Sequence, residues 1–203
     1  MSTATLPEWD IAQPPPVPVR RFTVEEYHRL IEHGLLTEQD RVELLEGWIT
    51  PKMVHNPLHD GTLDLVNEAL RRHLPDGWRL RIQSAIETGD SQPEPDVVAV
   101  RGDARSYLHR HPAADDIALI VEVADSSLWI DAGTKKRLYA RAGIPCYWIV
   151  NLIDQRLEVH MDPTGPSAEP LYRDERRLTK AETVALLLDG QEIDRIAVAH
   201  LLP

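Results

Sequence analysis

The chain has 203 residues, of which 42% are hydrophobic and 27% charged, and its 33 acidic and 22 basic side chains give a formal net charge of −11. These proportions are those of ordinary globular proteins and exclude a largely disordered chain. A single cysteine, Cys146, excludes an internal disulfide and a cysteine-rich zinc site. The acidic balance weighs against tight nonspecific binding to a polyanion unless basic residues gather locally.

The N-terminus has neither the basic start nor the apolar run of a secretion signal. No stretch approaches the roughly 20 apolar residues that span a bilayer. We therefore expect a cytoplasmic protein that does not bind membranes. Residues 1–20 contain five prolines and predict an extended proline-rich arm. Residues 21–203 have the length of a single domain.

A short helix and a hairpin are predicted after the arm. Thr23 can cap the helix, because a glutamate follows at the capping-box spacing, and Gly34 can end it. Residues 41–54 read as two strands joined by a turn at Glu46 and Gly47. These features predict an N-terminal hairpin preceded by one helix.

A long helix and two strands come next. Residues 58–74 carry apolar side chains at helical spacing, which places most of them on one face. Strands are predicted over 78–87 and 97–101, with the turn-rich residues 88–95 between them.

The second half of the chain contains the most apolar segment. Residues 117–124 are almost wholly apolar except for Glu122, the pattern of a central strand that is buried on both faces. After it we expect, in chain order, a helix capped by Ser126 or Ser127 and running through Arg141 to Gly143, a buried strand over 146–152, an edge strand over 156–161, a loop over 162–170, and short irregular strands beyond. This order predicts the strand-helix-strand crossover of an α/β protein.

Two carboxylates of these strands could share a metal ion. Asp96 follows Pro95 at the mouth of one strand, and Glu122 lies within the next. If the two strands pair, both oxygens could reach one divalent cation, and Mg²⁺ prefers such oxygen ligands. A buried glutamate is rare unless it is paired or metal-bound, so Glu122 favours a functional site. For Asp96 the alternative is a turn or cap after proline.

Lys135 stands thirteen residues after Glu122, on the helix that leaves this strand. Asp131, Lys135 and Tyr139 recur every four residues and so share one helical face. A cation at this place could stabilise the charge that develops on a phosphate during hydrolysis. The alternative is an ordinary ion pair between Lys135 and Asp131 on a solvated surface.

Several segments together carry a resemblance to a known family. They are P-E-P-D-V-V-A-V around Asp96, I-V-E-V-A-D-S-S-L around Glu122, D-A-G-T-K-K-R-L-Y-A-R-A-G-I-P-C-Y-W-I-V-N-L after it, and the upstream V-E-L-L-E-G-W-I with His59. As a joint pattern, over Phe22 to Met161, the chain resembles the Uma-two family of restriction endonucleases, a bacterial branch of the PD-(D/E)XK nuclease superfamily.

The resemblance implies a restriction-endonuclease-like α/β core, in which helices flank a mixed central sheet, with Mg²⁺ or Mn²⁺ as the cofactor and DNA as the partner. Asp96 and Glu122 match the metal ligands, Lys135 the catalytic lysine, and Glu43 an upstream acidic position. The wider superfamily has its lysine two residues after the glutamate, where this chain has Ala124. The lysine has therefore moved to the helix.

Other positions of the family pattern have simpler explanations. Gln83 matches a recurrent glutamine but reads better as a half-buried strand residue that satisfies a backbone group. His59 matches a position at the start of the long helix and suits a local hydrogen bond near the site. His55 and His59 have a zinc-like spacing, but Pro57 interrupts any helix between them. Cys146 and Asn151 depart from the family pattern outside the metal site.

Two groups of basic residues could neutralise backbone phosphates, the alternative being solvated faces balanced by acids. One comprises Arg71, Arg72, Arg79 and Arg81, and the other Lys135, Lys136, Arg137 and Arg141. Trp129, Tyr147 and Trp148 read as packing residues, and His109 and His111 as solvent-facing.

The leading hypothesis is a metal-dependent DNA endonuclease. A second hypothesis is a catalytically inert binding or regulatory module that keeps the nuclease fold, which the acidic balance favours. A homodimer is expected, because cutting both strands of a duplex requires two sites related by a two-fold axis.

Overall fold

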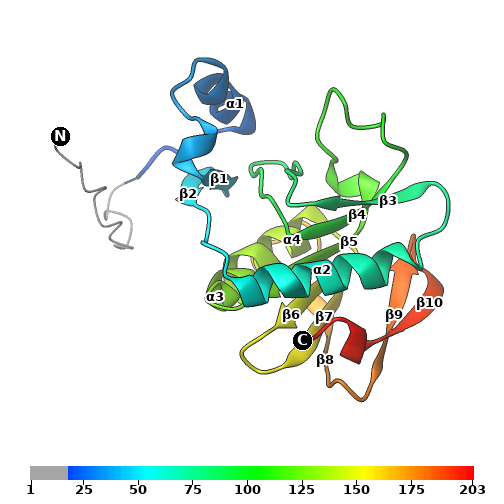
Figure 1. The fold of residues 1–203 in the computed structure, drawn as a ribbon. Coiled ribbons are helices and arrows are strands. Elements are labelled where there is room, and N and C mark those ends of the chain that lie inside the picture. The colour runs from blue at the N-terminus through cyan, green and yellow to red at the C-terminus, as the bar shows by residue number, and fades with distance from the viewer. Residues whose placement is uncertain (1–17) are drawn as a thin grey trace.

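A computed structural model describes residues 18–203 (Figure 1). The proline-rich arm predicted over residues 1–20 thus lies outside the described residues, apart from its last three. Within the described part of the chain, no helix is both long and apolar enough to cross a membrane.

The N-terminal helix and hairpin form where they were predicted. Helix α1 (Val24–Glu32) begins with a capping box between Thr23 and Glu26. Strands β1 (Val42–Leu45) and β2 (Trp48–Pro51) pair antiparallel. Gly47 in the turn has a φ of +78°, and an added Cβ would come within 2.9 Å of the Phe22 carbonyl oxygen. The turn therefore requires glycine at this position.

A mixed sheet of six strands forms the centre of the molecule, in the order β3-β4-β5-β6-β7-β8. Only β5 and β6 run parallel, and the other neighbours are antiparallel. The strands are β3 (Trp78–Ile82), β4 (Val97–Arg101), β5 (Ile117–Ala124), β6 (Cys146–Asn151), β7 (Arg156–Pro163) and β8 (Tyr172–Leu178). The predicted α/β fold with a mixed central sheet is confirmed.

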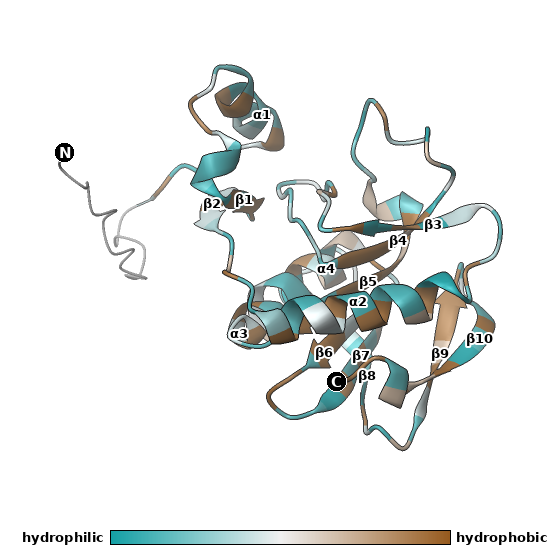
Figure 2. Cartoon of the chain, in the orientation of Figure 1, coloured by the Kyte–Doolittle hydropathy of each residue, from teal (hydrophilic) through white to brown (hydrophobic). Residues whose placement is uncertain are grey.

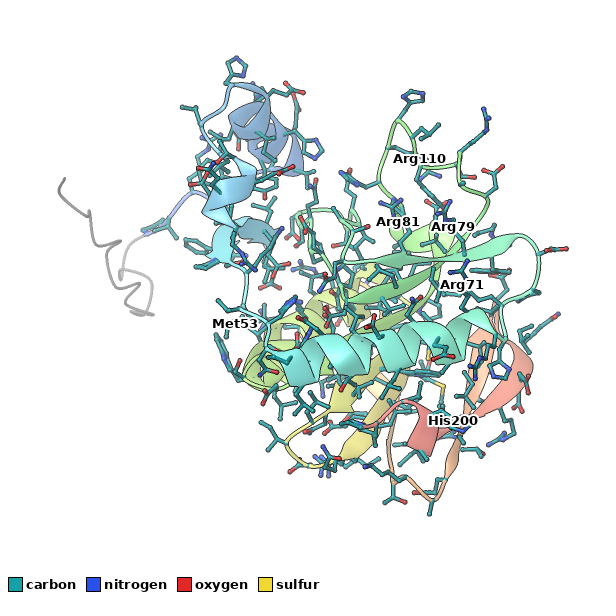
Figure 3. All side chains as sticks on the ribbon, viewed as in Figure 1. Met53, Arg71, Arg79, Arg81, Arg110 and His200 are labelled. Carbon is teal, nitrogen blue, oxygen red and sulfur yellow. The ribbon has the colours of Figure 1, made fainter. Side chains whose placement is uncertain are left out.

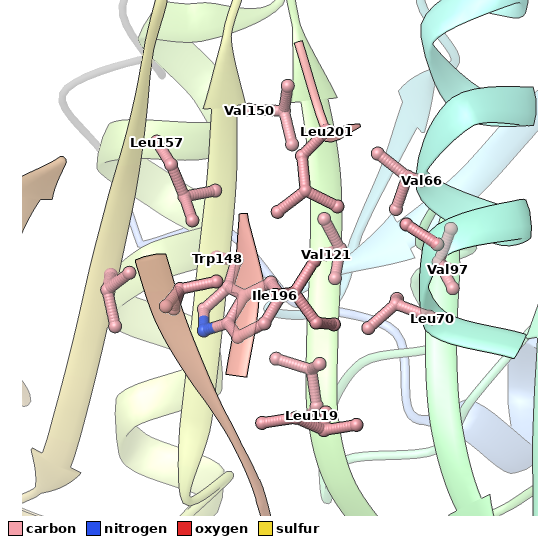
Figure 4. Close-up of a cluster of buried hydrophobic side chains, with 14 of the residues drawn as sticks. Val66, Leu70, Val97, Leu119, Val121, Trp148, Val150, Leu157, Ile196 and Leu201 are labelled. Atoms are coloured by element: carbon pink, nitrogen blue, oxygen red, sulfur yellow. The ribbon is translucent and has the colours of Figure 1, made fainter. Parts of the chain in front are cut away.

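Each face of the sheet is covered by a different layer. Helix α2 (Pro57–Arg71) and the hairpin of β9 (Thr183–Leu188) and β10 (Gln191–Ala197) pack on one face, around Trp148 (Figure 4). Helices α3 (Leu128–Ile130) and α4 (Lys136–Ala142) belong to the opposite face, where Leu138 and Tyr139 meet the sheet. Strand β5 lies between these layers and is buried along its whole length. Strand β5 is brown in Figure 2 because nearly all of its residues are hydrophobic.

The helix after β5 is interrupted. A π-helical turn over Asp131–Lys135 joins α3 to α4, and Gly143 closes α4 with a φ of +77°. Ser127 lies at the N-cap position, but its side chain makes no capping hydrogen bond. Trp129, expected to pack, is 57% exposed. The sequence thus predicted the extent of the helix but neither its π-turn nor the direction of Trp129.

Three other details of the strands were predicted wrongly. The strand expected over 78–87 ends at Ile82, because Gln83 has a φ of +43° and leaves the pleat. The presumed edge strand β7 is internal, since β8 pairs with it. The C-terminal strands are not short and irregular, because β9 and β10 form a hairpin with a single register shift.

His160 on β7 predicts a pH-dependent stability. The imidazole is buried beside the rings of Tyr147 and Tyr172, and neither of its nitrogens has a hydrogen-bond partner among the described residues. Burial, assisted by the nearby Lys136, lowers the pKa of His160 to about 4. The unfolded chain binds this proton near pH 6.5, so stability is lost as the pH falls from 6.5 toward 4, by about 3 kcal/mol at most.

Phenylalanine can stack in the same place without binding a proton. We expect His160→Phe to lose less free energy of unfolding than the wild type between pH 7 and pH 4.5, as measured by urea denaturation. His33→Phe is the control, because His33 is exposed. Equal losses in His160→Phe and the wild type would contradict the prediction.

Candidate active site

A pocket of about 320 Å³ opens where the N-terminal hairpin meets the central sheet. Its lining comes from β1, from the linker between β2 and α2, from the start of α2, and from the ends of β4 and β5 that lie next to the π-turn. The four residues predicted as catalytic all line it: Glu43, Asp96, Glu122 and Lys135. Segments far apart in the sequence thus contribute to one polar cavity.

Asp96 and Glu122 are brought together by the pairing of β4 with β5. These strands are antiparallel, and Val97 lies opposite Val121. This register places Asp96 beside Glu122, and the backbone N–H of Asp96 donates to Glu122 Oε2 at 3.3 Å. The predicted adjacency of the two strands is therefore found.

The two oxygens of Asp96 have different surroundings. Oδ2 accepts the backbone N–H of Val123 at 2.9 Å and lies 3.1 Å from His59 Nε2. Oδ1 has only a long contact, 3.4 Å to Gln83 Nε2. Burial raises the pKa of Asp96, but the hydrogen bonds from His59 and Val123, together with the charges of His59 and Lys135, lower it below its usual value. Asp96 is thus a carboxylate with one oxygen left for a ligand.

Glu122 is 3% exposed and is held by two donors from the helix after β5. Its Oε1 accepts from Lys135 Nζ at 2.9 Å and from the hydroxyl of Tyr139 at 2.9 Å. Burial raises the pKa of Glu122 well above its usual value, although the charge of Lys135 opposes the rise. The carboxylate therefore depends on a neighbouring cation to remain charged.

Lys135 is 8% exposed and lies at the end of the π-turn. Its Nζ is 3.5 Å from Asp131 Oδ1, so the ion pair considered from the sequence exists, but it is buried and not solvated. Burial alone would lower the pKa of Lys135, yet the charges of Glu122, Glu43 and Asp131 raise it well above its usual value. The ammonium group is therefore held in its charged form.

Asp131 is a member of the site that was not predicted. It lines the pocket and is almost fully buried, and its Oδ1 has no hydrogen-bond partner among the described residues. Its spacing from Lys135 was visible in the sequence. The signal was ambiguous because the same spacing is common in ion pairs on helix surfaces.

Glu43 faces the pocket from β1 and is buried. Its Oε2 accepts the backbone N–H of Glu94 at 3.0 Å. Through its charge Glu43 helps to keep the pKa of Lys135 high. It thus adds a third carboxylate to those of Asp96 and Glu122.

These donors fit a hard divalent cation. Carboxylate oxygens are the preferred protein ligands of Mg²⁺ and Mn²⁺. Asp96 Oδ1 has room for a ligand, and the remaining carboxylates of Glu122 and Glu43 line the same pocket. The chemistry of the donor set therefore agrees with the metal that was expected from the sequence.

Gln83 lies closer to this chemistry than was predicted. It is an exposed residue just beyond the end of β3, and not a half-buried strand residue. Its Nε2 lies between Asp96 Oδ1, at 3.4 Å, and His55 Nδ1, at 3.1 Å. An amide nitrogen donates to both acceptors, which places Gln83 at the mouth of the pocket.

His55, His59 and Asp60 form a second cluster of possible metal ligands, with donor atoms within 4.8 Å of one another. As expected, Pro57 begins α2 and leaves His55 outside the helix. The two imidazoles are stacked, 4.0 Å apart and inclined by 19°. Imidazole lone pairs lie in the ring plane, so nearly parallel rings direct them at different points. The cluster is poorly arranged for zinc, and His59 instead supports Asp96.

The second basic group predicted from the sequence does not form an exposed strip. Lys135 is buried, and the other three residues face acids of the same chain. The pairs are Lys136 with Glu175, Arg137 with Glu46, and Arg141 with Asp90. This part of the surface is therefore already neutralised.

A mixed sheet with two acidic residues on paired strands and a buried lysine beside them defines an α/β protein of nuclease fold. A similar fold occurs in a crystal structure from Anabaena variabilis, titled a "putative nuclease belonging to DUF820". The TM-score is 0.60 at 14% identity, over 89% of this chain and 97% of that one. The model of the Uma2 family, described as "Putative restriction endonuclease", matches residues 24–195, and the chain belongs to this family. Among curated proteins, none matches it.

Proposed function

We propose that this protein is a metal-dependent endonuclease that hydrolyses phosphodiester bonds of DNA. The observation that carries the proposal is the contact of Lys135 Nζ with Glu122 Oε1 at 2.9 Å, on the strand beside Asp96. A buried ammonium group next to two carboxylates offers both a metal site and a cation for the phosphate. Membership of a restriction-endonuclease family supports the same reaction class.

Asp96 and Glu122 would hold Mg²⁺ or Mn²⁺, with Glu43 close by. When bound, the metal lowers the pKa of a water molecule and polarises the phosphoryl group. Lys135 places a positive charge where the phosphate gains negative charge. His59 donates a hydrogen bond to Asp96 Oδ2, and the hydroxyl of Tyr139 donates one to Glu122 Oε1. These hydrogen bonds fix the orientation of each carboxylate.

The proposal extends to the setting of the reaction. The substrate is DNA, the site of action is the cytoplasm, and the active species is a homodimer whose two sites cut the two strands of a duplex. Sedimentation equilibrium tests the last point, and a protein that stays monomeric on duplex DNA would contradict it.

Metal removal tests the function itself. We expect purified protein to convert supercoiled plasmid to nicked and linear forms with Mg²⁺ or Mn²⁺, to stop when EDTA is added, and to resume when metal is restored. Calorimetry with Mn²⁺ is the second measurement. Protein that neither cleaves DNA with either metal nor binds Mn²⁺ would refute the proposal and favour an inert module.

A further inference from the structure

Arginines line the edge strand of the sheet on the face that carries the site. On β3, Trp78, Leu80 and Ile82 pack toward the core beneath α2. Side chains alternate along a strand, so Arg79 and Arg81 point to the opposite face. Asp96 and Glu122 belong to that face as well, because their neighbours two residues along the strands, such as Val98, pack there.

These two arginines have no acidic partner at ion-pair distance within residues 18–203, whereas neighbouring arginines do. The neighbouring pairs are Arg72 with Glu68, Arg101 with Asp189, and Arg110 with Asp116. The Nε atoms of Arg79 and Arg81 are buried without a hydrogen-bond partner. The chain has a net charge of −11, so acids are plentiful, and two arginines without an acidic partner indicate a surface that can bind an external anion.

Asp103, whose pKa is lowered mainly by the backbone N–H of Arg105 and in part by the charge of Arg79, does not pair with Arg79 at ion-pair distance. Asp103 Oδ1 accepts hydrogen bonds from Arg105 and Ser106 of its own loop. Burial and the charge of Arg79 both lower the pKa of Arg81. The two positive charges therefore repel each other, and a bound anion would relieve this repulsion.

The surrounding side chains hold this surface in place. The guanidinium groups of Arg81 and Arg110 lie 5.6 Å and 5.0 Å from the ring centre of Tyr107. Figure 3 shows Arg110, Arg81, Arg79 and Arg71 following one another along this edge of the molecule. Arg71, at the end of α2, also lacks an acidic partner at ion-pair distance among the described residues.

The edge strand leads directly into the pocket. Beyond Ile82, the backbone N–H of Gln83 donates to the carbonyl oxygen of Asp96 at 3.0 Å. At about 3.3 Å per residue, Arg79 to Gln83 spans roughly 13 Å. That length of helix axis holds about four phosphates of one strand of duplex DNA.

We propose that Arg79 and Arg81 form a phosphate-binding stripe that guides the backbone of duplex DNA along β3 toward Gln83 and the Asp96–Glu122 pocket. The inference rests on the proposed function and adds the direction from which the substrate enters. Contacts to phosphates carry no base identity, so the stripe contributes affinity for DNA of any sequence.

Fluorescence anisotropy with a labelled DNA duplex in EDTA, over a series of salt concentrations, tests the stripe without cleavage. We expect Arg79→Ala/Arg81→Ala to weaken binding about 10-fold or more and to reduce the slope of log K against log salt by about 2. Arg173→Ala/Arg195→Ala is the control, since it removes equal charge from arginines already paired with Asp162 and Glu192. It should bind like the wild type.

A third variant guards against a folding defect. Arg79→Lys/Arg81→Lys keeps both charges and should retain most of the affinity and salt slope. Wild-type binding by the double alanine variant, equal losses in the control, or tighter binding of duplex RNA than of duplex DNA would overturn the stripe. Any of those results would still be compatible with metal-dependent cleavage of DNA. Conversely, if binding depends on the two arginines but the protein cleaves no DNA, the proposed nuclease function is wrong and the phosphate-binding stripe is not.

Discussion

Asp96→Asn will reduce the rate of DNA cleavage by about 1,000-fold or more, equivalent to about 4 kcal/mol of transition-state stabilisation. Asparagine preserves the shape of the side chain and can still accept the backbone N–H of Val123. It removes the negative charge and the Oδ1 carboxylate oxygen, which a divalent metal prefers as a ligand. The measurements are single-turnover cleavage of supercoiled plasmid and calorimetric titration with Mn²⁺.

The control for this substitution is Asp115→Asn. Asp115 is exposed and lies outside the pocket, so the same chemical change should leave both cleavage and Mn²⁺ affinity unaltered. If Asp96→Asn cleaves at the wild-type rate, the site proposed on β4 and β5 is wrong. If it loses cleavage but keeps full Mn²⁺ affinity, Asp96 has another role than holding the metal.

Lys135→Met will affect both activity and stability. Methionine fills a similar volume but leaves Glu122 and Asp131 buried without their cation. Breaking a buried ion pair from one side typically costs about 3–5 kcal/mol. Loss of the charge next to the phosphate should also lower the cleavage rate by about 100- to 1,000-fold. Urea denaturation and single-turnover cleavage measure the two effects separately.

Two further variants distinguish the effects of Lys135. Lys136→Met removes the neighbouring charge, whose pair with Glu175 is partly exposed, and should change stability by less than about 1 kcal/mol. The double variant Lys135→Met/Glu122→Gln removes the stranded charge of Glu122 but leaves that of Asp131, so it should regain part of the lost stability and none of the activity. A Lys135→Met protein as stable and as active as the wild type would contradict the ion pair on which the proposal rests.

The sequence was most informative where burial forces a pattern on the chain. An eight-residue apolar strand interrupted by Glu122 could hardly be anything but central, and the strands of Asp96 and Glu122 do pair. The helical face of Lys135 was visible as well. Local rules of capping, turns and periodicity thus predicted most of the core elements.

Contacts between distant segments could not be read in this way. His59 reaches Asp96 across 37 positions of sequence, and Gln83 does so only because a positive φ turns it out of β3. Strand β8 carries five consecutive charged residues, Arg173 to Arg177, so its pairing with β7 was not evident from the sequence. The burial of Asp131 likewise depends on tertiary packing and not on its neighbours in the chain.

The π-helical turn determines how far α4 is rotated about the helix axis relative to α3. A π-turn amounts to one residue more than an α-helix of the same rise would hold, and each residue of an α-helix advances about 100° around the axis. With regular α-helical geometry throughout, Asp131 and Tyr139 could not both keep their present directions relative to Glu122. Lys135 thus reaches the sheet through a local change of helical pitch, and removing one residue from the turn would rotate one half of the site away from the other.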